Sequence, residues 1–413
     1  METATAPGTG VTEPELAALT DTIRAAQPAF LADFERLVNI DCGSYTKDGV
    51  DEIGRYVAGF LSDLGAEVEA RPDPSGRYGS TIVGRLRGTA GGPRVLLVGH
   101  MDTVFDAGTA AARPFRIDAD GRAYGPGVSD MKGGLLAGLH AVRALAEPGP
   151  LPFELLTFIA NPDEEVGSPT STPHIVEAAD GADVCLVLEC ARANGDIVSS
   201  RKGIVDARIT VEGRAAHAGV EPEKGRNAIL AAADVAQRLH ALNGRWDGVT
   251  LNIGVVSGGT RPNVVPERCE LQIDFRAVRR ADLIAAEAAI REVLGITSVP
   301  DTTAAFTELF RWWPMEKLER SGRLVEHAIA LAGRLGFELS DTSTGGASDA
   351  NTTSGMGVPS LDGLGPIGGS DHAPGEYLEV DSIVPRTTLV ACLLLAIARD
   401  PVVRGWRDDD RSA

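Results

Sequence analysis

The sequence predicts an α/β protein with a mixed, mostly parallel sheet and a smaller α+β domain inserted into it. Apolar strand-like runs alternate with helical patterns over the first half of the 413 residues. Strands that are apolar on both faces and separated by helices indicate a sheet covered on both sides. Between residues 201 and 312 the order becomes β-α-β-β-α-β, which is that of a ferredoxin-like unit. We therefore expect one domain from residues 1–200 and 313–413, and a second from residues 201–312.

The first domain begins with helices. Residues 14–40 have the apolar spacing of a helix, which we expect Pro28 to interrupt, and residues 50–65 form a helix that ends at Gly65. The next predicted elements are strands at 80–86 and 94–102, a helix at 132–146, a strand at 153–160, a helix at 171–179 and a strand at 183–189. Ligand sites in such folds lie beyond the carboxyl ends of the strands.

The inserted domain and the last part of the chain follow the same reasoning. The inserted domain has a strand at 204–213, a helix at 227–244, strands at 249–259 and 267–277, a helix at 281–295 and a strand at 301–310. After it come a helix at 322–336, a loop at 343–357, a short apolar segment at 358–366 and a helix at 380–399. The glycine-rich segments are interpreted as loops, because none is a G-x-G-x-x-G that opens a helix after a strand.

Charge and composition exclude several classes of function. Lys and Arg number 39 against 58 Asp and Glu, a formal net charge of −19, which opposes binding to nucleic acid or to an anionic membrane. The segment 1–15 lacks the basic and apolar regions of a secretory signal, and no apolar run reaches the roughly 18 residues that span a bilayer. The five cysteines are scattered, without C-x-x-C spacing. We expect a cytoplasmic location.

Two polar motifs lie at predicted element ends. His100 and Asp102 close the strand at 94–102 and would share a face, and a carboxylate often orients a metal-bound imidazole. The alternative is a polar pair that ends a strand. Asp130 precedes the helix at 132–146; it is either a helix cap or a carboxylate that bridges two cations.

Acidic residues end two further strands. Glu164 and Glu165 lie in "NPDEEVGS", and Glu189 lies in "VLVLEC". Each alone is compatible with a solvated charge. Three acidic strand ends and a histidine at one sheet edge favour a metal site, because mixed His and carboxylate ligands suit zinc, and two zinc ions about 3.5–4 Å apart can hold a hydrolytic water and a carbonyl oxygen. Asp163 is assigned only a turn-forming or supporting role.

The histidines fall into two groups. His100, His217 and His372 occur at strand ends or in glycine-flanked loops and are the candidates for chemistry. The others occur within or beside helical patterns and are interpreted as structural or solvated: His140, His174, His240 and His327.

Six motifs together resemble a known family. "GHMDTV", "YGPGVSDMKGG", "NPDEEVGS", "LEC", "GRAAHAG" and "HAPGEYL" occur in the order and at the intervals typical of the dizinc exopeptidase and aminoacylase family. That family includes bacterial glutamate carboxypeptidases, succinyl-diaminopimelate desuccinylase and acetylornithine deacetylase. The similarity covers residues 30–400. It implies a zinc-exopeptidase-like catalytic domain, with the inserted domain serving as a lid and as the contact of a homodimer.

The resemblance also assigns the metal centre. It implies two zinc ions per subunit, with cobalt or manganese as alternatives. One ion would be held by His100, Asp130 and Glu189, and the other by Asp130, Glu165 and His372. Asp102 would orient His100, and Glu164 would be the general base that takes a proton from the attacking water. The family also has a cis peptide after the bridging aspartate, here Asp130 to Met131.

Substrate contacts are implied for the inserted domain and for one loop. His217 would reach the active site of the partner subunit and stabilise the oxyanion. Asn263 and Arg276 match pocket positions, with a turn asparagine and a surface ion pair as their alternatives. Arg311 in "ELFRWWPM" matches the arginine that grips the α-carboxylate of the substrate. Gly346 lies in "TGGASDAN", a loop whose backbone would line the carboxylate pocket.

One departure from the family affects specificity. Trp312 and Trp313 follow Arg311 where relatives have smaller residues, so they either reshape the pocket towards a bulkier acyl group or pack the hinge. The predicted enzyme cleaves a peptide or N-acyl amide bond next to a free carboxylate in a small molecule or short peptide, and release of C-terminal glutamate is favoured. The alternatives are an N-acyl-amino-acid deacylase, a pathway-specific deprotecting amidohydrolase, and a metal-free binding protein with the same fold.

Overall fold

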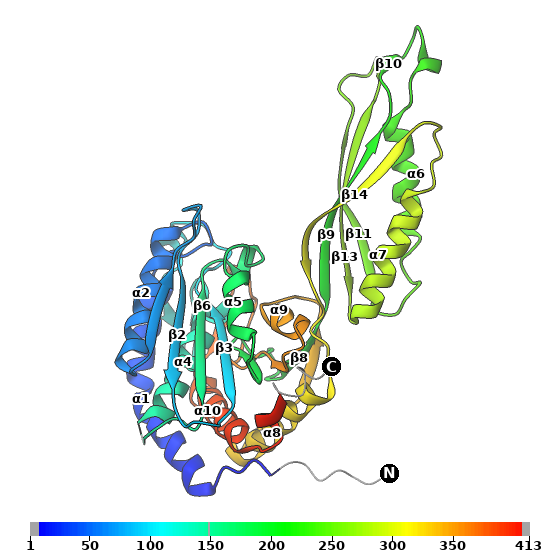
Figure 1. Cartoon of the computed structure of the whole chain (residues 1–413). Helices are drawn as coiled ribbons and strands as arrows, with labels where there is room; N and C mark the ends of the chain where they lie inside the picture. Colours follow the sequence, from blue (N-terminus) through cyan, green and yellow to red (C-terminus); the bar gives the residue numbers. More distant parts are fainter. Residues whose placement is uncertain (1–7, 148, 407–413) are drawn as a thin grey trace. The chain divides into compact units, whose positions relative to one another are not determined.

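The computed structural model describes residues 8–147 and 149–406, and it divides into two compact units (Figure 1). Unit 1 takes in the described parts of Met1–Ser199, Lys317–Ser343 and Ser348–Ala413, and unit 2 consists of Ser200–Glu316 and Thr344–Ala347. The first seven residues, on which part of the expectation about a secretory signal rests, lie outside the described residues.

Unit 1 is built on a six-stranded sheet in the order β1-β2-β6-β3-β7-β16. The strands are β1 (Glu67–Arg71), β2 (Thr81–Arg87), β3 (Arg94–His100), β6 (Leu155–Asn161), β7 (Val184–Val187) and β16 (Ser360–Leu361). The pairs β6-β3, β3-β7 and β7-β16 are parallel, whereas β1-β2 and β2-β6 are antiparallel. The predicted mixed, mostly parallel sheet is confirmed. Its parallel strands β3 and β6 are buried almost throughout, because helices flank the sheet.

Helices cover this sheet and meet in one apolar core. They are α1 (Glu13–Val38), α2 (Lys47–Asp63), α3 (Thr109–Ala112), α4 (Gly133–Ala146), α5 (Thr172–Ala179), α8 (Glu319–Leu335), α9 (Ala350–Gly355) and α10 (Ile383–Arg399). Helices α1, α4 and α10 pack against one another, and α2 packs on β2 (Figure 1). The prediction of a loop at 343–357 is wrong in part, because α9 forms within that segment.

Helix α1 differs from the prediction in being unbroken at Pro28. A proline inside a helix removes one backbone hydrogen bond and normally kinks or ends it. Here Phe30, Phe34 and Leu37 continue the buried face beyond the proline, and their burial holds the helix together. A Thr12–Glu15 capping box begins it.

Helix α10 corrects the expectation about apolar runs. Together with the short helical turn before it, α10 spans Val380–Arg399. Among the described residues, this segment is long and apolar enough to cross a membrane by length and composition, with a mean hydropathy of 1.7. In the structure 83% of that apolar window is buried inside the protein, as in the core helices of soluble proteins. Arg386 within it is 1% exposed and donates to the carbonyl oxygens of Gly195, Gly363 and Gly365. The expectation overlooked the run because this arginine and Asp381 interrupt it.

A second, small antiparallel sheet was not predicted. Its order is β17-β18-β5-β4, with β4 (Arg116–Ile117), β5 (Arg122–Tyr124), β17 (Gly368–Gly369) and β18 (Tyr377–Glu379). It brings the segment before Asp130 beside the segment around His372. Two further strands, β8 (Ile197–Arg201) and β15 (Asp341–Thr344), pair with each other.

Unit 2 has the predicted ferredoxin-like order. The elements are β9 (Gly203–Glu212), α6 (Ala228–His240), β11 (Thr250–Gly258), β13 (Arg268–Ala277), α7 (Arg280–Leu294) and β14 (Thr303–Trp312), and the sheet order is β11-β13-β9-β14. Both helices lie on one face of this antiparallel sheet (Figure 1). Strands β9 and β13 therefore alternate between residues buried under the helices and residues on the other face. A short ladder of β10 (Ala216–His217) and β12 (Val264–Val265) lies beyond the start of β13.

Candidate metal centre

His100 is the last residue of β3 and is 1% exposed. Its Nδ1 lies 3.0 Å from the carbonyl oxygen of Asp102 and 3.4 Å from that residue's carboxylate. Because both neighbours are acceptors, Nδ1 carries a proton, which leaves Nε2 as the nitrogen that can bind a metal once it loses its own proton. Nε2 faces a carboxylate oxygen of Asp130 at 2.9 Å and one of Glu189 at 3.5 Å. Asp102 thus lies where it would orient the imidazole.

Asp130 lies between two histidines. One of its carboxylate oxygens faces His100, and the other lies 3.0 Å from Nε2 of His372. The Asp130–Met131 peptide bond is cis, as the resemblance implied. His372 has φ of +61°, a left-handed conformation uncommon outside glycine. Asp130 is therefore placed to serve two ligand groups at once.

Glu164 and Glu165 form the short helical turn that follows β6. Both backbone N–H groups donate to the carboxylate of Asp102, at 3.1 and 3.2 Å. One oxygen of Glu165 lies 3.1 Å from Nε2 of His372, while the other is buried without a hydrogen-bond partner. Asp102 thus contacts both the histidine ligand and the turn that carries the glutamates.

Two groups of ligand atoms emerge, each within 4.8 Å: His100, Asp130 and Glu189, and Asp130, Glu165 and His372. Burial raises the pKa of Glu165 to about 7 and also raises the pKa of Glu189. Burial together with the nearby charges of Glu189 and Asp349 raises the pKa of Glu164 well above its usual range. Several buried carboxylates crowded together, one with an unpartnered oxygen, fit two divalent cations.

The histidines respond to the same carboxylates. Burial alone would lower the pKa of His100, but Glu189, Asp102 and Asp130 together raise it well above its usual value. Hydrogen bonds to Asp130 and Glu165 raise the pKa of His372 to about 10. Without a cation, protons on the histidines provide the positive charge that the carboxylates require.

Three buried carboxylates near the centre were not assigned a catalytic role from the sequence. Asp163 accepts hydrogen bonds from the hydroxyls of Thr170 and Ser171 and from the backbone of Thr170. Asp349 accepts from Asn161 at 2.7 Å and from Ser168 at 2.6 Å. Glu376 accepts three backbone N–H groups of the segment 127–130. Asp349 follows the predicted residue Gly346 by three positions, and Glu376 follows His372 by four. This closeness in sequence was the feature from which their role could have been predicted.

The remaining predicted residues lie in unit 2, in separate places. His217 and Asn263 are close to each other beside the β10–β12 ladder, where the N–H of Ala218 donates to the carbonyl oxygen of Asn263 at 3.0 Å. Both side chains are exposed.

Arg276 and Gly346 belong to a second group. Arg276 donates to the carbonyl oxygen of Gly345 at 3.2 Å and pairs with Asp274. Arg201, 4% exposed, donates to the carbonyl oxygen of Gly346 at 3.1 Å. Two guanidinium groups therefore meet at the loop predicted to line the carboxylate pocket.

Arg311 is on the opposite face of the same sheet. It is paired across the ladder with Val205, whose side chain is buried under the helices, and it forms ion pairs with Glu287 of α7 and with Glu308. Arg276 is paired with Ile204, on the helix-free face. Trp312 is 8% exposed and packs edge-on against Phe310, while Trp313 stacks on Arg280 and Arg311. Both tryptophans have packing contacts within unit 2.

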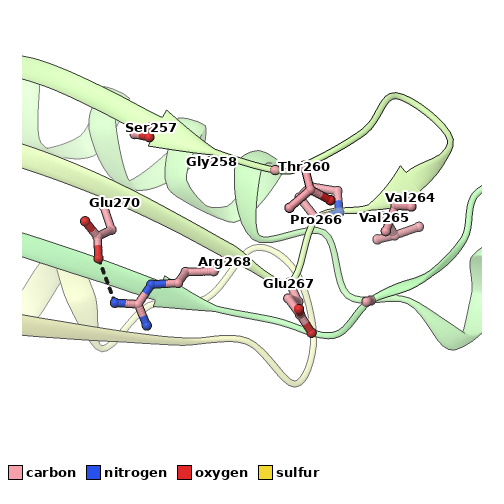
Figure 2. A pocket seen from close by; sticks show the side chains of 11 residues that line it. Ser257, Gly258, Thr260, Val264, Val265, Pro266, Glu267, Arg268 and Glu270 are labelled. Atoms are coloured by element: carbon pink, nitrogen blue, oxygen red, sulfur yellow. Dashed lines mark hydrogen bonds and ion pairs between the residues drawn. The ribbon is translucent and has the colours of Figure 1, made fainter.

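A pocket of about 420 Å³ lies near the start of β13 in unit 2 (Figure 2). Its lining includes Ser257, Thr260, Val265 and Arg268, and the guanidinium of Arg268 is turned towards Glu270 (Figure 2). None of the predicted site residues lines it. The pocket is therefore not the predicted substrate site.

The family model described as peptidase family M20/M25/M40 matches residues 96–396, a span that contains every predicted metal ligand. The chain belongs to the M20 family. Members of this family are metallohydrolases, so the chain is a hydrolase that depends on metal. The predicted family and the predicted enzyme class are confirmed.

Relatives of this M20 chain include both peptidases and deacylases. It is 31% identical to carboxypeptidase G2 of Pseudomonas sp. strain RS-16 over 399 residues, covering 96% of this chain and 95% of the relative. It is 26% identical to acetylornithine deacetylase of Edwardsiella ictaluri, covering 89% and 97% of the two chains. It shares its fold with a dinuclear metal-binding M20 peptidase of Bacillus subtilis, with a TM-score of 0.68, 15% identity, and 91% and 99% of the chains covered.

Proposed function

We propose that this M20 protein is a dizinc hydrolase that cleaves a peptide or N-acyl amide bond beside a free carboxylate, with release of C-terminal glutamate as the favoured reaction. The observation that carries the proposal is the pair of ligand groups that share Asp130. The similarity to a carboxypeptidase supports the reaction type. Deacylation of an N-acyl amino acid is the alternative, supported by the similarity to a deacetylase. Five free, buried cysteines support a cytoplasmic location.

The chain's own residues divide the chemistry between them. Zinc ions bound by the two groups would lower the pKa of a water molecule and polarise the scissile carbonyl. Glu164 belongs to neither ligand group, and its half-buried side chain lies close enough to Glu165 and Glu189 for their charges to raise its pKa, so its carboxylate is free to accept the proton of the water and to pass it to the leaving amine. Asp102 holds the His100 tautomer and the Glu164–Glu165 turn.

Between the two arginine candidates, Arg276 is better placed to hold the substrate carboxylate. It meets the 344–347 loop and pairs with one carboxylate, that of Asp274, whereas Arg311 pairs with two glutamates and lies on the other face of the sheet. We expect Arg276→Lys to raise KM by roughly 10-fold or more, because a lysine cannot replace a bidentate guanidinium. Arg311→Lys should change KM little. Steady-state kinetics with one N-acyl glutamate measures KM for both variants. A raised KM in Arg311→Lys with a normal KM in Arg276→Lys would identify Arg311 as the partner of the substrate carboxylate.

The distance between the two groups in unit 2 supports a homodimer. His217 and Asn263 lie beyond the first residue of β13, whereas Arg276 is near its last. This 10-residue strand is about 30 Å long, while each residue of an extended substrate spans only about 3.5 Å. One small substrate therefore cannot contact both groups of the same chain. His217 and Asn263 would serve the partner's site, and Arg276 would serve its own.

An exposed edge offers a surface for such a dimer. β11 is an outer strand of its sheet, and Val255 and Val256 on it are 48% and 61% exposed. Ile229 and Leu230, at the start of α6, are also exposed. Apolar residues on an open edge favour pairing with a second chain.

The experiment is a product assay with matched variants. Purified protein is incubated with a panel of N-acyl glutamates, dipeptides and N-acetyl amino acids, and the products are identified by mass spectrometry before and after removal of zinc. Glu164→Gln should lower kcat by about 10²–10⁴-fold with the metal content unchanged. Activity that survives complete zinc removal, or a fully active Glu164→Gln variant, would contradict the mechanism. A protein that binds no metal and turns over nothing would support the metal-free binding protein.

A further inference from the structure

Glu376 is a buried carboxylate with an unusual set of partners. It is 1% exposed, and one of its oxygens accepts the N–H groups of Ser129 at 2.8 Å and Asp130 at 3.0 Å. The other oxygen accepts the N–H group of Gly127 at 3.0 Å. In the part of the chain that the structure describes, no Lys, Arg or His side chain pairs with it. Its hydrogen-bond donors are the backbone of a single loop.

The three backbone N–H groups that point at Glu376 require a side chain that accepts hydrogen bonds. Burying a carboxylate without a counter-ion is costly unless hydrogen bonds satisfy it, and backbone N–H groups that donate to a charged acceptor form the stronger, charge-assisted class of bond. Three such donors from four consecutive residues make a concave anion-binding backbone. A carboxylate has only acceptors, so it matches all three donors at once.

The loop that Glu376 holds carries the residue shared by both ligand groups. Asp130 supplies one oxygen towards His100 and the other towards His372. Gly127 has φ of +75°, and a side chain there would run into Thr103, so the loop is closely packed. Glu376 follows His372 by four residues in the chain. A single carboxylate therefore joins the Asp130 loop to the segment that contains His372.

We propose that Glu376 is a positioning residue that fixes the Asp130 loop, so that the shared carboxylate presents one oxygen to each metal before either ion binds. The proposal rests on the two-metal function proposed above. Glu376 does not touch substrate or metal in this account, because its effect passes through the backbone of residues 127–130. Replacing one of its acceptor oxygens should loosen that backbone and weaken the binding of both metals.

The substitution Glu376→Gln tests the chemistry with little change of shape. The amide NH2 group would face a backbone N–H group, so at least one of the three hydrogen bonds becomes a repulsive donor pair. Glu379→Gln is the matched control, because Glu379 is three residues further on, has a side chain 39% exposed and, among the described residues, forms an ion pair with Arg122 alone. Glu376→Asp keeps the charge with a shorter reach and should lie between wild type and Glu376→Gln.

Three measurements give the outcome. In metal-free protein, hydrogen exchange of a peptide spanning residues 125–131 should be at least about tenfold faster in Glu376→Gln and unchanged in Glu379→Gln. Metal titration should show about 10–100-fold weaker binding. In the dicobalt protein, the magnetic coupling between the ions should fall, because that coupling depends on the shared ligand. Rapid exchange is the direct sign of a released loop and needs no metal.

Failure of the positioning role can be distinguished from failure of the proposed two-metal function. If wild type binds two metals and Glu376→Gln binds them equally tightly with unchanged exchange at 125–131, the inference is wrong. If wild type binds no metal pair, the proposed function fails, while the exchange data still report whether Glu376 holds the loop. Should Glu376→Gln not fold, Glu376→Asp decides: wild-type metal affinity combined with fast exchange at 125–131 would overturn the positioning role.

Discussion

Asp163, Glu164 and Glu165 are consecutive in the chain but have three different surroundings. Asp163 points back into the turn and accepts from Thr170 and Ser171. Glu165 contacts His372, and Glu164 remains outside both ligand groups. Repulsion among the three is relieved at Asp163 by the two hydroxyl groups, and at Glu165 by His372 and, in our proposal, by zinc.

We predict that Asp163→Ala destabilises the metal-free protein by about 2–4 kcal/mol, because it leaves the buried hydroxyl of Ser171 and the partly buried donors of Thr170 without an acceptor. Urea denaturation measures the change. Asp21→Ala is the control, since that side chain is 77% exposed and its loss should alter the free energy of unfolding by less than about 0.5 kcal/mol. Equal effects of the two substitutions would show that the Asp163 contacts do not hold the turn.

At the scale of elements, helix α4 packs directly against the end of β7. Gly134, in the first turn of α4, faces the carbonyl oxygen of Leu188, and a Cβ atom there would overlap that oxygen. Leu188 directly precedes the ligand Glu189. The contact between a glycine and a strand end therefore helps to set the position of a metal ligand.

We predict that Gly134→Ala destabilises the protein and weakens metal binding, although alanine is the better helix former by about 1 kcal/mol. Gly322→Ala in α8 is the matched control, because nothing lies within 4 Å of a Cβ atom there, and it should stabilise the protein by about 0.5–1 kcal/mol. Thermal unfolding and zinc titration of both variants supply the comparison. A stabilised Gly134→Ala with normal zinc affinity would contradict the prediction.

Most elements were predictable, and the exceptions have physical causes. Helix α1 continues through Pro28 because its buried face on both sides of the proline outweighs one missing hydrogen bond. The small sheet of β17, β18, β5 and β4 escaped prediction because its strands are two or three residues long, too short to show a period. Helix α9 was missed because its polar sequence has no apolar stripe, yet Ala350, Asn351 and Thr353 are buried.

At the scale of the whole molecule, the buried carboxyls couple stability to pH and metal. Glu165 and Asp349 have pKa values raised to about 7, chiefly by burial. Between about pH 4.5 and pH 7 the folded protein holds protons that the unfolded chain has released, so its free energy of unfolding falls as the pH rises. His372 adds to this trend, because its stabilising charge is lost as the pH approaches about 10.

We therefore expect the Tm of the EDTA-treated protein to fall from pH 5 to pH 8. Zinc should raise Tm more at pH 8 than at pH 5, because carboxylate and imidazole ligands must lose their protons to bind it. Scanning fluorimetry with and without zinc measures both trends. A Tm that rises with pH in EDTA would contradict the assignment of raised pKa values to these carboxyls.

The homodimer proposal predicts complementation between two inactive variants. His217→Ala and Glu164→Gln should each lose most activity as pure proteins. After they are mixed and reassociated, a mixed dimer combines His217 from one chain with Glu164 of the other at one of its two sites, restoring about a quarter of wild-type activity. No recovery, with mixed dimers verified by mass spectrometry, would contradict action of His217 in the partner's site.

The sequence by itself determined the alternation of elements and the types of residue at the strand ends, since both are encoded by local patterns of burial and by short motifs. Only the tertiary structure decided how the carboxylates are used. Asp349 and Glu376 act on residues about 180 to 250 positions earlier in the chain, and no local pattern reports such contacts. Arg311 is a further case: a bulge between Glu308 and Phe310 shifts the alternation of β14 and turns Arg311 towards α7. A one-residue irregularity in a strand reverses the face on which every later side chain lies, so the arginine that meets the 344–347 loop could be identified only from the folded chain.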